Sequence, residues 1–438
     1  MSELERVKTN VEELKTGMHV SALDRPWSQT SFPLQGFLIR SKRELQALSS
    51  VCQYVYVDVT KSRFSDEDGA EKLFKSSANG SSKSGPSKDS VRKSSKPLSV
   101  NRERYKSITT LPKQNDLNKA ASSLARITKS LKSIHNDIRA GATLDEHTLN
   151  ATSDVLVDAV VKTPTAAFWA ALLQKHHDGI YNHGLRAATW GLICGRHMGL
   201  ESVELKRLAQ GILLKDVYRL SEDKTVSNSS EAVLTSVELL RETGVQPKVI
   251  SVVKYHRERF NGSGKPFGLA GEKIPFLARL ASVSTAYDLM LYPIRGNKTP
   301  QSPSQATKLL YDQKGRAFQE ELVIEFIEAM GLYPLGTLVK LSSGERAVVV
   351  KQNEGRRLKP SVLVLDSDES LTAKPGRTID LSENLQITIV EDLPAQAGLE
   401  AGSYTEVFED AFKTLISIEG NGKGSKTSFV SRIFSREN

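Results

Sequence analysis

Apolar and polar positions along the chain follow three successive patterns, which are separated by polar stretches. In residues 10–60, short apolar runs alternate with turn-forming residues. The runs "MHVSAL", "GFLIR" and "YVYVDV" have the composition of strands, whereas "KRELQALSS" has the spacing of a helix. This pattern predicts a small N-terminal α+β domain over residues 1–62.

Residues 63–112 lack such a pattern and consist mainly of Ser, Lys, Gly and Asn, most densely in "KSSANGSSKSGPSKDSVRKSSKPLS". A segment of this composition does not bury enough apolar area to offset the entropy that it loses on ordering. No aromatic residues lie between the basic residues of the quoted part of this segment, which favours a solvated linker over a surface for nucleic acid or membrane. We therefore predict a flexible linker.

Helical periodicity governs residues 113–333. The stretch "LNKAASSLARITKSLKSIHNDI" places apolar residues three and four positions apart, which gives one apolar stripe along a helix. Further helices are predicted at "LDEHTLNATSDVLVDAVVK", "TAAFWAALLQKH", "HGLRAATWGLICGRHMG", "ESVELKRLAQGILLKDVYRL", "SEAVLTSVELLRETG", "QPKVISVVKYHRERF", "PFLARLASVSTAYDLML" and "QEELVIEFIEAMG". Together they predict a multi-helix domain.

Short β-branched runs return after "GLYPLGT". The runs "LVKL", "ERAVVVKQN" and "SVLVLD" are interrupted by "SSGE" and "NEGRR", and they predict a small β appendage over residues 334–392. Residues 393–438 are expected to be a loosely ordered tail with one short helix near "EVFEDAFKTLI". The predicted fold class is mainly α, with a small N-terminal α+β domain and a small C-terminal β appendage.

Composition adds a few constraints. The 60 Lys and Arg residues against 51 Asp and Glu residues give a net charge of +9, which suits anionic partners, although much of the excess lies in the linker. Cys52 and Cys194 lie in unrelated contexts and predict neither a disulfide nor a zinc site. No stretch approaches the roughly 18 apolar residues of a membrane span, and the N-terminus lacks a signal pattern. We expect a cytoplasmic protein.

Asp216 is the first candidate for a chemical role. It lies four and three residues after Ile212 and Leu213, the last positions of a buried helical stripe, and so continues that stripe. A buried carboxylate there requires a cation or hydrogen-bond donors. Lys215 faces about 100° away around the helix, so we expect no obligatory pairing between the two. Both a structural, ion-paired acid and a functional acid fit this pattern.

The stretch "KYHRERFNGSGKP", residues 254–266, holds a second group of candidates. His256 and Glu258 end a helix, and the glycines that follow permit a tight loop. With Lys265 and Arg257 nearby, such a loop suits a phosphate group. An ordinary helix-ending turn explains the pattern equally well.

Histidines elsewhere in the helical region give weaker signals. His183, in "IYNHGLRAATWGL", lies near the start of a helix, where a lone histidine is more often a polar residue than a ligand. His176 and His177 are adjacent, so their side chains diverge and do not chelate one metal as histidines at i and i+4 do.

Taken in order, these stretches resemble the HD-GYP domain, a branch of the HD phosphohydrolases. The resemblance covers residues 115–391 and is carried by "NHGLRAATWGLICGRHMGL", "LAQGILLKDV", "HRERFNGSGKP", "GEKIPFLARLASVSTAYDLM" and "GLYPLGTLVKLSSGERAVVV". Residues 10–60 are similar to a domain of unnamed function that often precedes HD-GYP domains. The resemblance implies a phosphodiesterase that hydrolyses cyclic di-GMP at a site with two or three metal ions.

Several positions depart from the family's metal-binding pattern. His183, Asp216 and His256 stand at ligand positions that are kept. Ligands are replaced by Lys215, Arg257 and Thr285, and no histidine occurs between His197 and His256, where another is expected. Because two ligand positions carry cations that repel a metal, the resemblance implies that the metal site is lost. We expect no cofactor, or Fe, Mn or Mg if a reduced site persists.

The loop of the GYP motif departs less from the family pattern. Asn261 replaces an aspartate and Lys265 a tyrosine, while the sequence "GSG" remains. The candidates for phosphate or nucleotide contacts are Glu258, Arg259, Asn261, Gly262, Gly264, Lys265, Asp288 and Arg295.

Three functions follow as hypotheses. The first is a catalytically inactive HD-GYP protein that acts as a regulatory or cyclic di-GMP-binding module. The second is an active phosphodiesterase with a reduced metal site, and the third is a scaffold without nucleotide affinity. Fold alone does not choose among them. Expected partners are cyclic di-GMP and other signalling proteins, with no nucleic acid and no membrane span. Cations that converge on one cleft would favour a phosphate ligand, and cations paired with Asp216, Glu258 and Asp288 would favour neutralisation.

Overall fold

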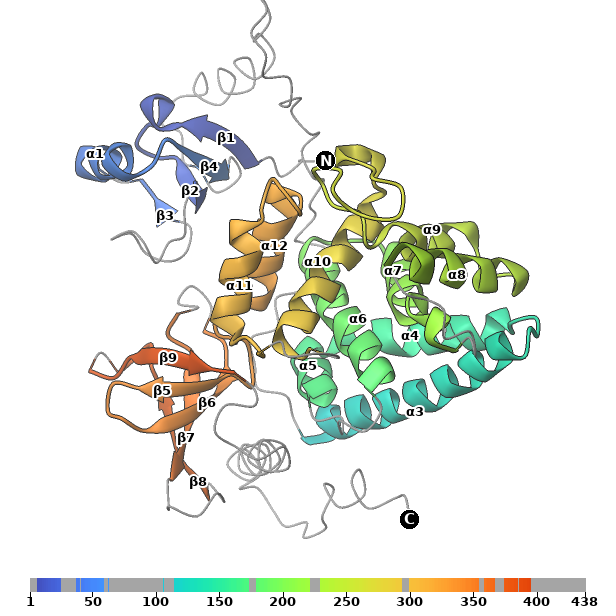
Figure 1. The fold of residues 1–438 in the computed structure, drawn as a ribbon. Helices are drawn as coiled ribbons and strands as arrows, with labels where there is room; N and C mark the ends of the chain where they lie inside the picture. Colours follow the sequence, from blue (N-terminus) through green and yellow to red (C-terminus); the bar gives the residue numbers. More distant parts are fainter. Residues whose placement is uncertain are drawn as a thin grey trace, which may run out of the picture. The chain divides into compact units, whose positions relative to one another are not determined.

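The structure is a computed structural model, and it describes residues 6–24, 37–39, 41–58, 62, 105, 114–172, 179–220, 229–293, 299–353, 358–366, 374–384 and 386–394. The chain divides into two compact units, Met1–Asn101 and Arg102–Asn438 (Figure 1). The predicted linker lies outside the described residues apart from Tyr105, and the predicted tail apart from Leu393 and Pro394.

The N-terminal unit is a four-stranded antiparallel sheet with one helix, in agreement with the predicted α+β domain. Its strand order is β1-β4-β2-β3. The elements are β1 (Arg6–Asn10), β2 (His19–Leu23), β3 (Phe37–Leu38), α1 (Lys42–Val51) and β4 (Tyr54–Asp58). Helix α1 begins with a capping box, in which the Ser41 hydroxyl accepts from the Glu44 backbone N–H and the Glu44 carboxylate accepts from that of Ser41. Strand β1 was not predicted from the sequence.

The second unit is mainly helical, which confirms the predicted fold class. Its helices are α3 (Gln114–Arg139), α4 (Glu146–Lys162), α5 (Pro164–Leu172), α6 (Gly179–His197), α7 (Ser202–Leu214), the 3₁₀ turn η4 (Val217–Leu220), α8 (Ser229–Glu242), α9 (Pro247–Tyr255), α10 (Phe276–Leu291), α11 (Pro303–Asp312) and α12 (Glu320–Met330). In the described part of the chain, no single helix is long and apolar enough to cross a membrane, and only the pair α4 and α5, bent by 118°, reaches that length and hydropathy.

Two helices differ from the sequence prediction. The helix predicted to run to Leu220 ends at Leu214, and the chain then turns into η4. Helix α11 was not predicted, although "SPSQ" marks its start: Ser302 and Gln305 form a capping box, and Pro303 occupies the first helical turn.

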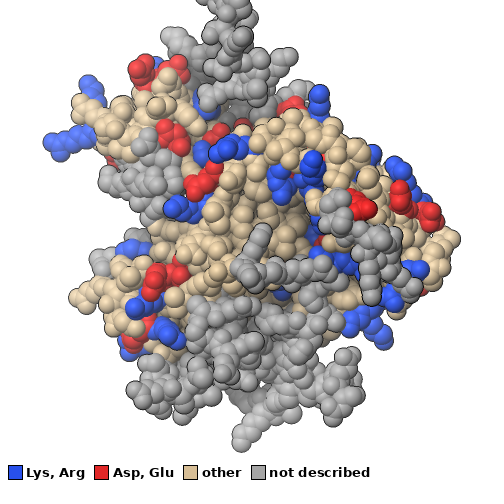
Figure 2. All heavy atoms as spheres, viewed as in Figure 1, with Lys and Arg blue, Asp and Glu red and all other residues tan. Residues whose placement is uncertain are grey.

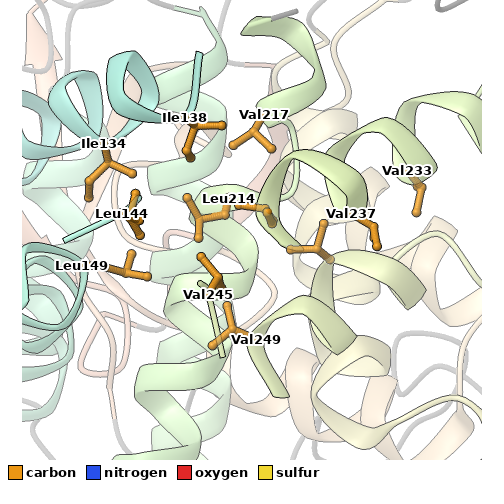
Figure 3. Close-up of a cluster of buried hydrophobic side chains, with 12 residues drawn as sticks. Ile134, Ile138, Leu144, Leu149, Leu214, Val217, Val233, Val237, Val245 and Val249 are labelled. Atoms are coloured by element: carbon orange, nitrogen blue, oxygen red, sulfur yellow. The ribbon is translucent and has the colours of Figure 1, made fainter. Parts of the chain in front are cut away.

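A cluster of buried aliphatic side chains connects α3, α4, α7, α8 and α9 (Figure 3). Its members are Ile134, Ile138, Leu144, Leu149, Leu214, Val217, Val233, Val237, Leu240, Val245, Val249 and Val253. Leu214 directly precedes Lys215, and Val217 directly follows Asp216. The cluster therefore fixes the backbone on both sides of this pair, because close-packed side chains leave little room for displacement.

The β appendage is a five-stranded antiparallel sheet in the order β8-β7-β6-β5-β9. Its strands are β5 (Leu338–Leu341), β6 (Arg346–Lys351), β7 (Ser361–Asp366), β8 (Lys374–Asp380) and β9 (Ile389–Leu393). It meets the helices at the start of α11, where the Ser304 backbone N–H donates to the Asp392 carboxylate at 2.7 Å and the Ser304 hydroxyl donates to it as well.

The surface charges on one face of the molecule are of both signs. On the face that Figure 2 shows, Lys and Arg side chains occur together with Asp and Glu side chains.

Candidate functional site

The candidate residues are brought together from four helices. His183 lies on α6, Lys215 and Asp216 follow α7, His256 is the C-cap of α9, and Asp288 lies on α10. All five side chains are buried. The site is thus a buried polar cluster inside the helical unit.

Lys215 and Asp216 form an ion pair, which the helical pattern of the sequence left open. The Lys215 ammonium donates to Asp216 Oδ2, and Lys215 is only 1% exposed. Lys215 is the C-cap of α7, and its long side chain reaches the carboxylate of the next residue. Burial raises the pKa of Asp216, but Lys215 and then His183 outweigh it and hold the pKa well below its ordinary value.

Arg257 approaches Asp216 and His256. Its Nη2 lies 3.5 Å from Asp216 Oδ1, and its Nε donates to His256 Nε2 at 3.3 Å. On the other side of the ring, His256 Nδ1 donates to the Val253 carbonyl at 2.7 Å. Burial, followed by Arg257 and Lys215, lowers the pKa of His256 to about 3. His256 is therefore neutral, with its only lone pair directed at a cation.

Asp288 connects α10 to α6 through four hydrogen bonds. Its carboxylate accepts from His183 Nδ1 at 2.7 Å, from Arg186 Nε and Nη2 at 2.8 and 3.1 Å, and from Trp190 Nε1 at 3.0 Å. Burial raises the pKa of Asp288, but Arg186 and His183 outweigh it and keep the carboxyl ionised. Asp288 is thus a fully satisfied anchor and not a free nucleotide contact.

Arg186 and Trp190 were missed by sequence reasoning. The available signal was their spacing, because residues 183, 186 and 190 share one face of a helix. His135 on α3 was also missed. It is buried and interacts electrostatically with Asp216, and burial lowers its pKa to about 4.

The residues present do not fit a divalent metal ion. Asp216 already pairs with Lys215 and faces Arg257, while the Nε2 lone pair of His256 accepts from Arg257. His183 Nε2 lies 3.9 Å from Asp216 Oδ2 and has a pKa lowered by burial and then by Lys215. Thr285, at the third replaced position, is buried and offers a neutral hydroxyl. A metal bound here would face one ammonium and one guanidinium group.

The Gly-rich loop is held by Glu258 and not by a cation. The Glu258 carboxylate, 2% exposed, accepts from the backbone N–H groups of Phe267 at 2.8 Å and Leu269 at 2.9 Å. Gly264 is required by close contact, since a Cβ atom there would lie 2.2 Å from the Arg259 nitrogen. Glu258 therefore serves the loop's conformation.

The remaining loop candidates do not converge on one cleft. Arg259 Nη1 donates to Ser282 Oγ at 2.8 Å and to the Glu258 carbonyl at 3.1 Å. Asn261 accepts from Ser263, Gly262 adopts a positive φ of 82°, and Lys265 is exposed. Arg295 and the adjacent histidines His176 and His177 lie outside the described residues. The cations nearest to Asp216 are paired with it, which is the arrangement expected for neutralisation.

Comparison with protein families agrees with this architecture. Residues 6–148 match a domain of unknown function (DUF3391), residues 218–322 match the HD domain, and residues 338–397 match a KOW domain associated with HD domains. The chain thus carries an HD domain with the DUF3391 domain in front of it and the KOW domain after it.

Two individual proteins are also similar to this chain. The chain is 26% identical over 404 residues to the cyclic di-GMP phosphodiesterase PA4108 of Pseudomonas aeruginosa, covering 88% of this chain and 92% of that protein. Over 68 residues it is 41% identical to the cyclic di-GMP phosphodiesterase response regulator RpfG of Xanthomonas campestris, which covers 16% and 18% of the two chains. Both relatives are named as cyclic di-GMP phosphodiesterases.

A solved structure is also similar. Bd1817, an HDG"Y"P protein from Bdellovibrio bacteriovorus, is 15% identical, with a TM-score of 0.40 over 74% of this chain and 99% of that one.

Proposed function

We propose that this chain is a catalytically inactive HD-GYP protein that acts as a regulatory module in cyclic di-GMP signalling. One observation carries the proposal: the Lys215 ammonium, 1% exposed, donates to Asp216 at the position where the family resemblance implies a metal ion. Phosphodiester hydrolysis at such a site requires a metal ion to activate water and to stabilise charge. An ammonium group neutralises the carboxylate but supplies no bound hydroxide.

The neighbouring groups support the same conclusion. Arg257 adds a second permanent cation 3.5 Å from Asp216, and it also engages His256. Glu258, the nearest further carboxylate in the HRER motif, uses its oxygens to accept from two backbone N–H groups of the loop. The alternative of an active phosphodiesterase therefore has to draw its metal ligands from groups that are already engaged.

The hydrolysis assay tests this proposal. The full-length chain is incubated with cyclic di-GMP and excess Mn²⁺, or Fe²⁺ without oxygen, and pGpG and GMP are separated by chromatography. We expect no product above that formed without protein. Product from the wild-type chain that is lost in both Asp216→Asn and His256→Gln would show a working reduced site and overturn the proposal, provided both variants retain the wild-type circular dichroism spectrum.

A variant with metal-binding side chains at three positions of the site serves as the positive control for metal binding. The triple variant Lys215→His, Arg257→His and Thr285→Asp replaces two cations and a neutral hydroxyl by metal-binding groups. We expect Mn²⁺ to bind at Asp216 in this variant and not in the wild-type chain. Equal binding at Asp216 in both proteins would contradict the role assigned to Lys215.

A scaffold without nucleotide affinity is the second candidate, because the ion pairs of Asp216 use cations that a phosphate ligand would require. Equilibrium dialysis of the full-length chain against cyclic di-GMP separates the two. Saturable binding that weakens in Arg257→Gln, with Lys248→Gln on α9 as the control, supports the dinucleotide-binding module. No binding supports the scaffold.

A further inference from the structure

A second group of metal-binding side chains lies at the far end of α6. His197 is the last residue of α6, and Glu325 and Glu328 lie on α12, which packs against that helix. His197 Nε2 lies 3.5 Å from Glu325 Oε2 and 3.7 Å from Glu328 Oε2. His197 follows His183 by 14 residues, about 21 Å along the helix, so this cluster is separate from the site at Asp216.

The geometry of the three groups is that of ligands around one ion. Their ligand atoms all lie within 4.8 Å of one another. At metal–ligand distances near 2.1 Å, tetrahedral neighbours are about 3.4 Å apart. The distances from His197 to the two carboxylates approach this value, whereas they exceed the usual length of a hydrogen bond between nitrogen and oxygen.

His197 itself is placed as a ligand would be. Its Nε2 atom is buried and makes no hydrogen bond within the part of the chain that the structure describes. Buried polar atoms normally have a partner, so an imidazole nitrogen directed at two carboxylates without a hydrogen bond requires an explanation. A bound cation supplies one.

The two carboxylates add negative charge in a largely apolar setting. Glu325 is 3% exposed, and its helix neighbours Leu322 and Phe326 are buried in the core. Glu328 lies one turn further on, so both carboxylates face the same side of α12. Burial raises the pKa of the nearby Cys194 thiol, and Glu325 and Glu328 raise it further. A divalent cation would neutralise both carboxylates at once.

We propose that His197, Glu325 and Glu328 bind one divalent transition-metal ion, with Zn²⁺ as the best match. One imidazole and two carboxylates suit Zn²⁺, whereas Mg²⁺ and Ca²⁺ prefer oxygen ligands only. Water completes the coordination. The ion joins α6 to α12, and α12 is the last helix before strand β5, so the metal stabilises the folded unit at its junction with the β appendage.

Metal titration of the full-length chain tests this site. Protein freed of metal with a chelator is titrated with Zn²⁺ by calorimetry, and the bound metal is counted by mass spectrometry. We expect one Zn²⁺ per chain and a rise in melting temperature on binding. His197→Ala, and independently Glu328→Gln, should weaken binding at least tenfold, while His147→Ala, at an exposed position of α4, and Asp216→Asn should retain it. Glu328 is partly exposed, so Glu328→Gln keeps a test available if His197→Ala does not fold.

Cobalt gives a second readout. Co²⁺ bound by an imidazole and two carboxylates absorbs visible light, and this absorption should vanish in His197→Ala and persist in Asp216→Asn.

Each other outcome has a definite meaning. If Zn²⁺ does not bind, or binds equally to His197→Ala and Glu328→Gln, the inference is wrong and the three groups form an ordinary histidine–carboxylate contact. If binding is instead lost in Asp216→Asn alone, the metal occupies the site next to Lys215, and both this inference and the proposed function fail. Absence of binding alone leaves the proposed function intact.

Discussion

Lys215 shows how one side chain changes the chemistry of a whole site. Its ammonium is buried beside Asp216. His183 and His256 also interact electrostatically with Asp216. Removing one partner of a buried ion pair leaves the other charge uncompensated, which costs more than the pair contributes when intact. Lys215 is therefore required by Asp216, whatever ligand the protein binds.

We predict that Lys215→Met lowers the free energy of unfolding by about 3 kcal/mol, because it removes the hydrogen-bonded cation of Asp216 and leaves only the Arg257 guanidinium at 3.5 Å. The double variant Lys215→Met and Asp216→Asn should recover most of that loss. Urea unfolding measures both. Lys162→Met, which removes an exposed pair with Asp158, serves as the control and should change stability by less than about 0.5 kcal/mol. An equal loss in Lys215→Met and Lys162→Met would refute this prediction.

At the scale of elements, the site depends on how closely α7 and α9 approach. A Cβ atom at Gly211 would lie 2.5 Å from Val252 Cβ and 2.6 Å from its Cγ1. The glycine therefore allows the two helices to pack at a distance that no larger residue permits. Lys215 and Asp216 follow α7, and His256 caps α9, so this contact also sets their separation.

Gly211→Ala should destabilise the protein by about 1 to 3 kcal/mol, because overpacking forces the two helices apart. The matched control is Gly184→Ala on α6, where a Cβ atom would meet nothing closer than 4.0 Å. This control should leave stability unchanged or raise it by up to about 1 kcal/mol, since alanine favours helix. Thermal unfolding compares the two, and equal stability of both variants would count against close helix packing at residue 211.

For the whole molecule, buried neutral histidines make stability depend on pH. The pKa of His256 is lowered to about 3 and that of His135 to about 4, with burial as the largest cause in both. In the unfolded chain each has its ordinary pKa of 6.5. Between these values the unfolded state binds more protons, so the stabilisation is complete above pH 6.5 and declines as the pH falls.

At pH 5 the protonation of each of these two histidines in the unfolded chain should lower the free energy of unfolding by about 2 kcal/mol relative to pH 7. Urea unfolding at pH 7 and at pH 5 measures the combined effect of the two histidines on the free energy of unfolding. His135→Phe, which removes one titrating ring, should reduce the difference between pH 7 and pH 5 by about 2 kcal/mol. If His135→Phe leaves the difference unchanged, His135 does not titrate as its burial requires.

Much of the fold could be predicted from the sequence because helix and strand patterns are local. The stripe of apolar residues predicted α3, and the β-branched runs predicted β5, β6 and β7. Helix α11 was missed because it is short and lies close to a polar, proline-containing stretch. Lys215, Arg257 and Thr285 could also be singled out from sequence, since they stand inside the motifs that carry the family resemblance.

What the sequence by itself determined was the class of fold and the kinds of group at each motif position. Only the tertiary structure decided how these groups pair. Arg186 and Asp288 lie 102 positions apart, and the sequence contains no sign that they form an ion pair. Lys215 pairs with Asp216 just beyond the end of α7, and His197 meets Glu325 because α6 packs on α12. Periodicity depends on neighbours along one element, whereas partner choice depends on distances between elements, which the packing of the core sets.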